Sequence, residues 1–122
     1  MRNQPKYHFF KNTTYALNGL KDMISNETSF KIELALVLVL LPVLCLLPLE
    51  LLYKLVMFIA LMGIPMAEAI NSAIERVTDL VTLEYHEMAG RAKDAGSAVV
   101  FLSIVIFVVV WGFSLLHIFF QK

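Results

Sequence analysis

The sequence is poor in charged residues and in cysteine, and both shortages limit what the chain can be. Charged residues make up 16% of its 122 positions, against about 25% in an average soluble domain. Hydrophobic residues reach 59%, which is more than a protein of this size can hide from water, so the bilayer is the expected solvent. The single cysteine, Cys45, excludes an intrachain disulfide and lies in an apolar run as a small hydrophobic residue.

The sequence carries no net charge, and its first residues and length lead us to expect neither a removable leader nor a second domain. Ten basic and ten acidic residues cancel, so no overall field attracts nucleic acid. Residues 1–11 hold no apolar stretch followed by a small-residue cleavage site, so we expect no signal peptide. The length fits one domain, 1–122, without a separate P-loop or protein-kinase lobe.

Long apolar runs, in contrast, are present, and they lie at 32–48, 51–74 and 98–120. Each is close to the ~20 residues that a helix needs to cross hydrocarbon. Only helices satisfy the backbone of such a segment in lipid. We therefore expect an all-α membrane protein whose three transmembrane helices lie at 31–48, 51–79 and 95–120.

Residues 5–28, before the first run, predict an amphipathic helix. In a helical projection its apolar side chains share one face, namely Phe9, Phe10, Ala16, Leu17, Leu20, Met23 and Ile24. This pattern is typical of a helix lying in the membrane interface, and a helix packed on other protein would show it too.

The basic residues predict how the chain is oriented. They cluster before the first run and between the second and third, whereas the opposite side carries only Lys54 and Lys122. Positive residues stay inside, so the N-terminus and the 76–94 connection should be cytoplasmic and the C-terminus periplasmic.

A stripe of polar side chains closes the second run. At 100° per residue, Glu68, Asn71, Glu75 and Asp79 fall within roughly 80° of one another. A carboxylate at membrane depth costs at least ~2.5–3.5 kcal/mol, so Glu68 is a functional candidate, with a protonated interhelical hydrogen-bond donor as the structural alternative. Because this helix runs toward the cytoplasm, Glu75 lies about 10 Å nearer the cytosol than Glu68 and can meet a water-soluble ligand.

The connection that follows carries groups suited to phosphate. Arg91 and Lys93 can neutralise phosphate, and the glycines at 90 and 96 permit turns or close approach of the backbone to a ligand. An ordinary solvated connection rich in positive-inside residues would look similar. His86 has no second histidine or cysteine nearby, which argues against zinc, whereas carboxylates suit Mg²⁺.

Glu27, just before the first span, has two interpretations. Its charge can favour the dipole of the helix that follows, or it can form a two-carboxylate metal site with Glu75. The spacing does not decide between them.

The order and spacing of the polar residues at 68–98 resemble the motif of the prokaryotic integral-membrane diacylglycerol kinases. The resemblance covers essentially the whole chain. Its motif positions are Glu68, Asn71, Ser72, Ala73, Ile74, Glu75, Asp79, Glu84, Tyr85, His86, Glu87, Gly90, Arg91, Ala92, Lys93, Asp94, Gly96, Ser97 and Ala98. The intact run at 87–91 resembles the Gram-negative type more than Gram-positive relatives that phosphorylate undecaprenol.

The resemblance implies a homotrimer in the bacterial inner membrane, with composite sites that transfer the γ-phosphate of ATP to diacylglycerol and give phosphatidate. By position, Glu68 is the expected general base, and Glu27 and Glu75 are the expected Mg²⁺ ligands. The implied nucleotide site comprises His8, Tyr15, Glu27, Glu75, Glu84, Tyr85, His86, Lys93 and Asp94. Asn71 and Ser97 are expected near the lipid acceptor.

Two positions depart from the family pattern. His8 stands where relatives often have arginine, which puts one phosphate contact in doubt because neutral histidine carries no fixed charge. Leu17 replaces a common tryptophan and should alter lipid packing only. The rival functions are undecaprenol phosphorylation by the same mechanism, and a non-enzymatic ion-conducting or scaffolding protein whose Glu68 carries protons.

Overall fold

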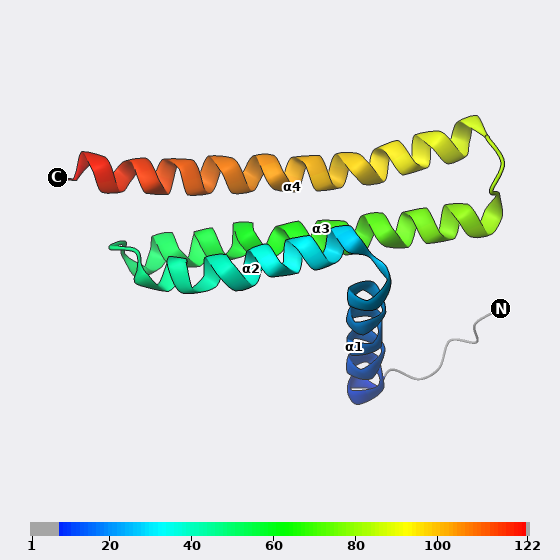
Figure 1. Cartoon of the computed structure of the whole chain (residues 1–122), viewed down its shortest axis with the longest axis horizontal. Coiled ribbons are helices and arrows are strands. Elements are labelled where there is room, and N and C mark those ends of the chain that lie inside the picture. The colour runs from blue at the N-terminus through cyan, green and yellow to red at the C-terminus, as the bar shows by residue number, and fades with distance from the viewer. Residues whose placement is uncertain (1–7, 122) are drawn as a thin grey trace.

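The computed structural model describes residues 8–121, which form four helices and no strand. In chain order the helices are α1 (Phe9–Asn26), α2 (Thr28–Leu46), α3 (Leu51–Val81) and α4 (Glu87–Phe120). The last three are long and apolar enough to cross a membrane, which confirms the expected all-α architecture with three candidate spans. In Figure 1, α3 and α4 lie side by side, α2 packs on α3, and α1 runs crosswise to them.

The helix bounds lie close to the predicted ones except at the start of α4. This helix begins at Glu87, although the apolar pattern places the start of the span at 95. Its 34 residues make a helix about 51 Å long, against about 30 Å of hydrocarbon. Hydropathy marks only the part that lies in lipid, while polar residues with good helix propensity continue the helix beyond it. Lys93 and Asp94 therefore lie on α4 and not in a connecting loop.

Residues 1–7 and 122 lie outside the described part of the chain. The predicted start of the first helix at residue 5 falls there, as do three of the basic residues used for the orientation, Arg2, Lys6 and Lys122. Within the described part, the 18 residues of α1 extend from Phe9 to Asn26.

Local chemistry explains where the chain turns. A single extended residue, Glu27 (φ −123°, ψ 115°), separates α1 from α2 and redirects the chain. Leu47 is extended after the end of α2 because the proline that follows it disfavours helical backbone. After α3, the Glu84 backbone N–H donates to Thr82 Oγ1 at 3.1 Å. The Met88 N–H then donates to His86 Nδ1 at 3.1 Å, which caps the start of α4.

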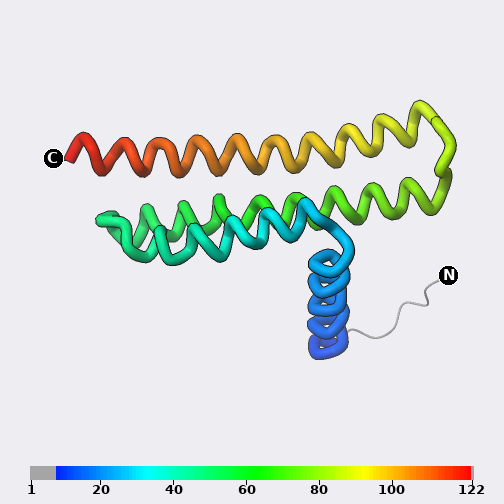
Figure 2. Tube along the Cα trace, in the orientation of Figure 1, coloured from blue at the N-terminus to red at the C-terminus, as the bar shows by residue number. Residues whose placement is uncertain are grey.

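The apolar core lies toward the end of the molecule where α2 turns into α3. Met57 and Leu61 are fully buried there, and the Trp111 indole Nε1–H of α4 donates to the Met57 carbonyl at 3.0 Å. Figure 2 shows that the α2–α3 turn and the end of α4 share this end, while the α3–α4 connection and α1 lie away from it. The contacts between acidic side chains of different helices and their partners lie away from this apolar end.

Candidate active site

The acidic stripe of α3 begins with Glu68, which faces the first turns of α2. Only 9% of Glu68 is exposed, and the Ser29 hydroxyl of α2 donates to its Oε1 at 2.9 Å. Glu33, one turn farther along α2, interacts with Glu68 as a like charge. Its Oε2 is buried and has no hydrogen-bond partner among the described residues. The structure thus brings the carboxyl groups of Glu68 and Glu33 close enough to interact near the start of α2.

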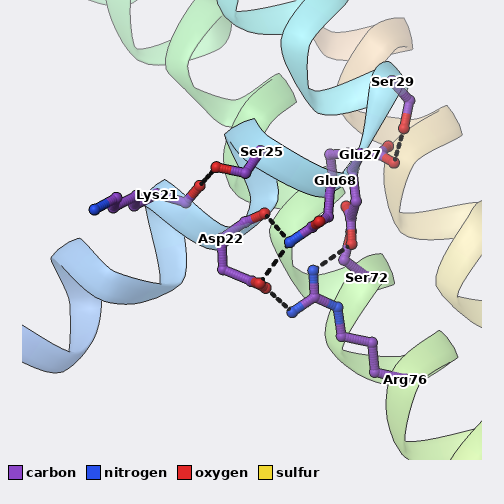
Figure 3. A network of polar contacts seen from close by, with 9 residues as sticks. Lys21, Asp22, Ser25, Glu27, Ser29, Glu68, Ser72 and Arg76 are labelled. Carbon is purple, nitrogen blue, oxygen red and sulfur yellow. Dashed lines mark hydrogen bonds and ion pairs between the residues drawn. The ribbon is translucent and has the colours of Figure 1, made fainter.

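Glu27 turns toward α3, and its side-chain contacts are made there. It makes no capping hydrogen bond to α2. Its Oε2 accepts a hydrogen bond from the buried Ser72 hydroxyl, and its Oε1 accepts one from Arg76 Nη2 at 2.7 Å. Figure 3 shows Glu27 between these two α3 residues. The carboxylate therefore contacts the turn of α3 that also carries Glu75, whose own side chain accepts from Asn71.

The same arginine ties α1 to α3. Arg76 Nη1 donates to Asp22 Oδ2, while Nη2 holds Glu27. The Asp22 carboxyl also accepts from the Asn26 amide at 2.8 Å. The hydrogen bond from Arg76, the largest cause, lowers the pKa of Asp22 below its ordinary value of 3.8. Asp22 therefore keeps its charge to a lower pH than an isolated aspartate does.

Asn71 links the acidic stripe to α4. Its amide Nδ2 donates to Glu75 Oε1 at 3.4 Å, and the residue is 8% exposed. A Cβ placed on Gly96 of α4 would overlap Asn71 Oδ1. Gly96 is helical, and no described residue has a positive φ, so its role is close helix approach and not a turn. Gly90 is likewise helical.

A polar cleft of about 210 Å³ lies where α3 ends and α4 begins. Lys93 Nζ pairs there with Asp79 Oδ1 at 2.7 Å across the two helices. Four residues of the implied nucleotide site contribute to its lining, namely Glu84, Tyr85, His86 and Lys93. The cleft combines a cation with carboxylates and an aromatic ring, which is suitable for a phosphorylated ligand.

The remaining predicted site residues lie on exposed surface outside that cleft. His8 flanks the start of α1 and Tyr15 lies on this helix. Asp94 and Ser97 are exposed on α4, and Glu75 is exposed on α3. Within this single chain, the structure thus brings some predicted residues together and leaves others apart.

The carboxylates fit a hard divalent cation. No group of three or more histidine, cysteine or acidic residues comes together within residues 8–121, so the chain offers no complete protein cage there. Mg²⁺ needs none, because it is usually bound through one or two carboxylates together with substrate phosphates and water. Glu27 contacts the turn of α3 that carries Glu75, and both residues offer the type of oxygen ligand that Mg²⁺ takes.

Sequence reasoning missed the partners that hold these carboxylates. These partners are Ser29 and Glu33 on α2, Asp22 on α1 and Arg76 on α3. They lie 35 to 54 positions in sequence from the residues that they contact. The charged ones also look like ordinary juxtamembrane charges. One signal in the sequence could have indicated these contacts. Ser72 and Arg76 lie four residues apart, so they extend the polar face of α3 on which a partner could bind.

Comparison with known proteins places the chain among lipid kinases of bacteria. The profile of a family described as "Prokaryotic diacylglycerol kinase" matches residues 14–115. The chain is 42% identical over 106 residues to a diacylglycerol kinase of Haemophilus influenzae, covering 86% of this chain and 89% of that protein. It is 37% identical over 97 residues to the diacylglycerol kinase of Escherichia coli K12, and the match covers 80% of this chain and 80% of that protein. A diacylglycerol kinase of Pseudomonas aeruginosa is 35% identical over 104 residues, and the match covers 85% of this chain and 85% of that protein.

Proposed function

The chain belongs to the prokaryotic diacylglycerol kinase family and is a lipid kinase, and from this premise we propose that it transfers the γ-phosphate of ATP to diacylglycerol at the cytoplasmic membrane face. The observation that carries this proposal is the buried Glu68 carboxylate, held by Ser29 on the same helix face as the exposed Glu75. The product is phosphatidate. Family membership leaves no room for the non-enzymatic alternatives.

Helix length supports the division of roles along α3. Its 31 residues begin at Leu51 and span about 46 Å, so they exceed a hydrocarbon layer of about 30 Å. Twenty residues from Leu51 reach position 70, so Glu68 lies in the last embedded turn and Glu75 and Asp79 lie beyond it. An alcohol arriving from the leaflet would meet Glu68, and a nucleotide from water would meet Glu75.

Glu68 is our candidate general base. Ser29 fixes one oxygen of its carboxylate, which orients the group without neutralising it. In the proposed step, Glu68 accepts the hydroxyl proton of the lipid while the hydroxyl oxygen bonds to the γ-phosphorus. The bond between that phosphorus and the bridging oxygen breaks, and ADP leaves.

The other polar residues bind and position the nucleotide. Glu27 and Glu75 would hold Mg²⁺, which when bound supplies positive charge against the phosphate oxygens. Lys93, which pairs with Asp79 at 2.7 Å, adds a mobile point charge beside the cleft. The ring of Tyr85, 95% exposed, offers a surface for the base, together with Glu84 and His86.

A homotrimer would complete this site. The cleft of about 210 Å³ is smaller than the roughly 300–1,000 Å³ of a typical ligand pocket. Asp94 and Ser97 are exposed in the single chain. We propose that a neighbouring copy closes over them. Mixing Glu68→Gln chains, which have no turnover, with Lys93→Met chains, whose KM for Mg·ATP is raised, should restore activity at low Mg·ATP if Glu68 and Lys93 of one site come from different copies, and no restoration would mean that one copy supplies both residues.

The location follows from the same pattern. Exposed Phe9, Phe10 and Leu17 on α1 support a helix lying in the interface of the bacterial inner membrane. Basic residues before α2 and between α3 and α4 support a cytoplasmic N-terminus and a periplasmic C-terminus.

The central experiment is lipid phosphorylation in mixed micelles with radiolabelled ATP, with and without Mg²⁺. We expect label in phosphatidate only when Mg²⁺ is present. Glu68→Gln should abolish turnover while the affinity for Mg·ATP survives, and equal loss of both would reassign Glu68 to metal binding. Undecaprenol in a parallel reaction tests the other acceptor, and preferential labelling of undecaprenol would overturn diacylglycerol as substrate.

A further inference from the structure

Arg76 stands where three elements of the chain meet, and one guanidinium serves two acids. Nη1 contacts Asp22 of α1, and Nη2 lies 2.7 Å from Oε1 of Glu27 at the α1–α2 junction. Arg76 itself belongs to α3, directly after Glu75. Figure 3 shows the two acids approaching the same guanidinium from different sides.

Little else fixes the position of the Glu27 carboxylate. Its backbone is extended between two helices, and its side chain makes no capping bond to α2. Among the residues of α1, only Met23 is buried, so apolar packing on the rest of the chain holds this helix weakly. The two side chains of α3 that contact Glu27, Ser72 and Arg76, therefore determine where its oxygens lie.

From this geometry we propose that Arg76 is a positioning residue of the kinase, which holds the Glu27 carboxylate on the turn of α3 that carries Glu75. Asp22 in turn keeps the guanidinium in place. The inference rests on the proposed function, in which Glu27 and Glu75 hold the metal of Mg·ATP. Arg76 contacts neither lipid nor nucleotide in this scheme and acts through Glu27.

The arrangement requires arginine and not merely a positive charge. Two separate nitrogens at the end of a rigid planar group reach two carboxylates at once. Lysine has a single nitrogen on a flexible stem and cannot hold both acids in the same geometry. A partner that orients a metal-ligating carboxylate typically contributes 10–100-fold to metal affinity or activity.

The test compares Arg76→Lys, which keeps the charge, with Arg76→Met, which removes it. Calorimetry with Mg²⁺ and a non-hydrolysable ATP analogue gives affinity, and lipid phosphorylation gives KM and kcat. We expect Arg76→Lys to weaken Mg-nucleotide binding and raise KM by roughly tenfold, with kcat at saturation changed by no more than about twofold. Arg76→Met should do at least as much. Lys21→Gln, which removes a cation from the same turn of α1, is the matched control and should leave KM unchanged.

A double-mutant cycle separates positioning from a general structural role. In a Glu27→Gln background, Arg76→Lys should have little further effect on nucleotide affinity, because the carboxylate it orients is gone. Additive losses in both backgrounds, or wild-type affinity in Arg76→Lys, would overturn the inference. The proposed function fails separately, when the wild-type chain itself labels no lipid or when Glu27→Gln binds Mg-nucleotide normally.

Discussion

The close approach of α4 to α3 at Gly96 gives the sharpest test of how the site is built. A Cβ at position 96 would overlap Oδ1 of Asn71 and lie 3.4 Å from Ile74 Cδ1 and 3.5 Å from Asn71 Cγ. Asn71 is buried and donates to Glu75. Gly96→Ala must therefore either displace the Asn71 amide or push the two helices apart.

The magnitude follows from two opposing terms. An inserted methyl in a packed interior costs about 1–3 kcal/mol, while replacing a helical glycine by alanine gains about 0.5–1 kcal/mol. A Cβ added to Gly112 of the same helix would meet nothing within 4 Å, so Gly112→Ala carries only the second term. The difference in free energy of unfolding between the two variants should be about 1–3 kcal/mol, in favour of Gly112→Ala.

Unfolding in mixed micelles measures this difference. The only tryptophan, Trp111, is buried, so its fluorescence reports the loss of α3–α4 packing. We also expect Gly96→Ala to raise KM for Mg·ATP, because the Asn71–Glu75 contact is disturbed. Removing the obstacle in the double variant Asn71→Ala/Gly96→Ala should recover most of the lost stability. Equal stability of Gly96→Ala and Gly112→Ala would refute the steric argument.

Three further outcomes are expected. Trp111→Phe removes the hydrogen bond to the Met57 carbonyl and should lower the free energy of unfolding by at least about 0.5–1.5 kcal/mol without changing KM for Mg·ATP, as measured by circular dichroism and kinetics. Lys93→Met should raise that KM by about tenfold or more, as expected when a charge-assisted contact is lost. Asp79→Asn, which removes only the ion pair at 2.7 Å, should leave the KM nearly unchanged, and equal effects would contradict a phosphate role for Lys93. Because Arg76 lowers the pKa of Asp22 below 3.8, the contribution of this pair to α1 docking is fully present above pH 3.8 and is lost as the pH falls through the lowered value. A spin label on α1 should gain mobility only in that acidic range, with no such transition in Asp22→Asn.

Much of the fold is decided by local properties of the sequence. Apolar runs of about 20 residues specify spanning helices because lipid offers the backbone no other partner. The helical period then places Glu68, Asn71, Glu75 and Asp79 on one face without reference to any other element. The rise per residue of this one helix also gives the separation of Glu68 and Glu75 along the helix axis, with no information from other elements.

Contacts between elements depend on how helices are placed, and no local pattern encodes that. The sequence left two interpretations of Glu27, and only the packing of α1 and α2 on α3 directs its carboxylate to Ser72 and Arg76. Likewise, glycine at 96 permits either a turn or a close approach, and the position of Asn71 across the helix pair decides for the latter. Side-chain partners 39 to 54 positions apart meet only after the helices have packed, since each contact is a property of two surfaces and not of one segment.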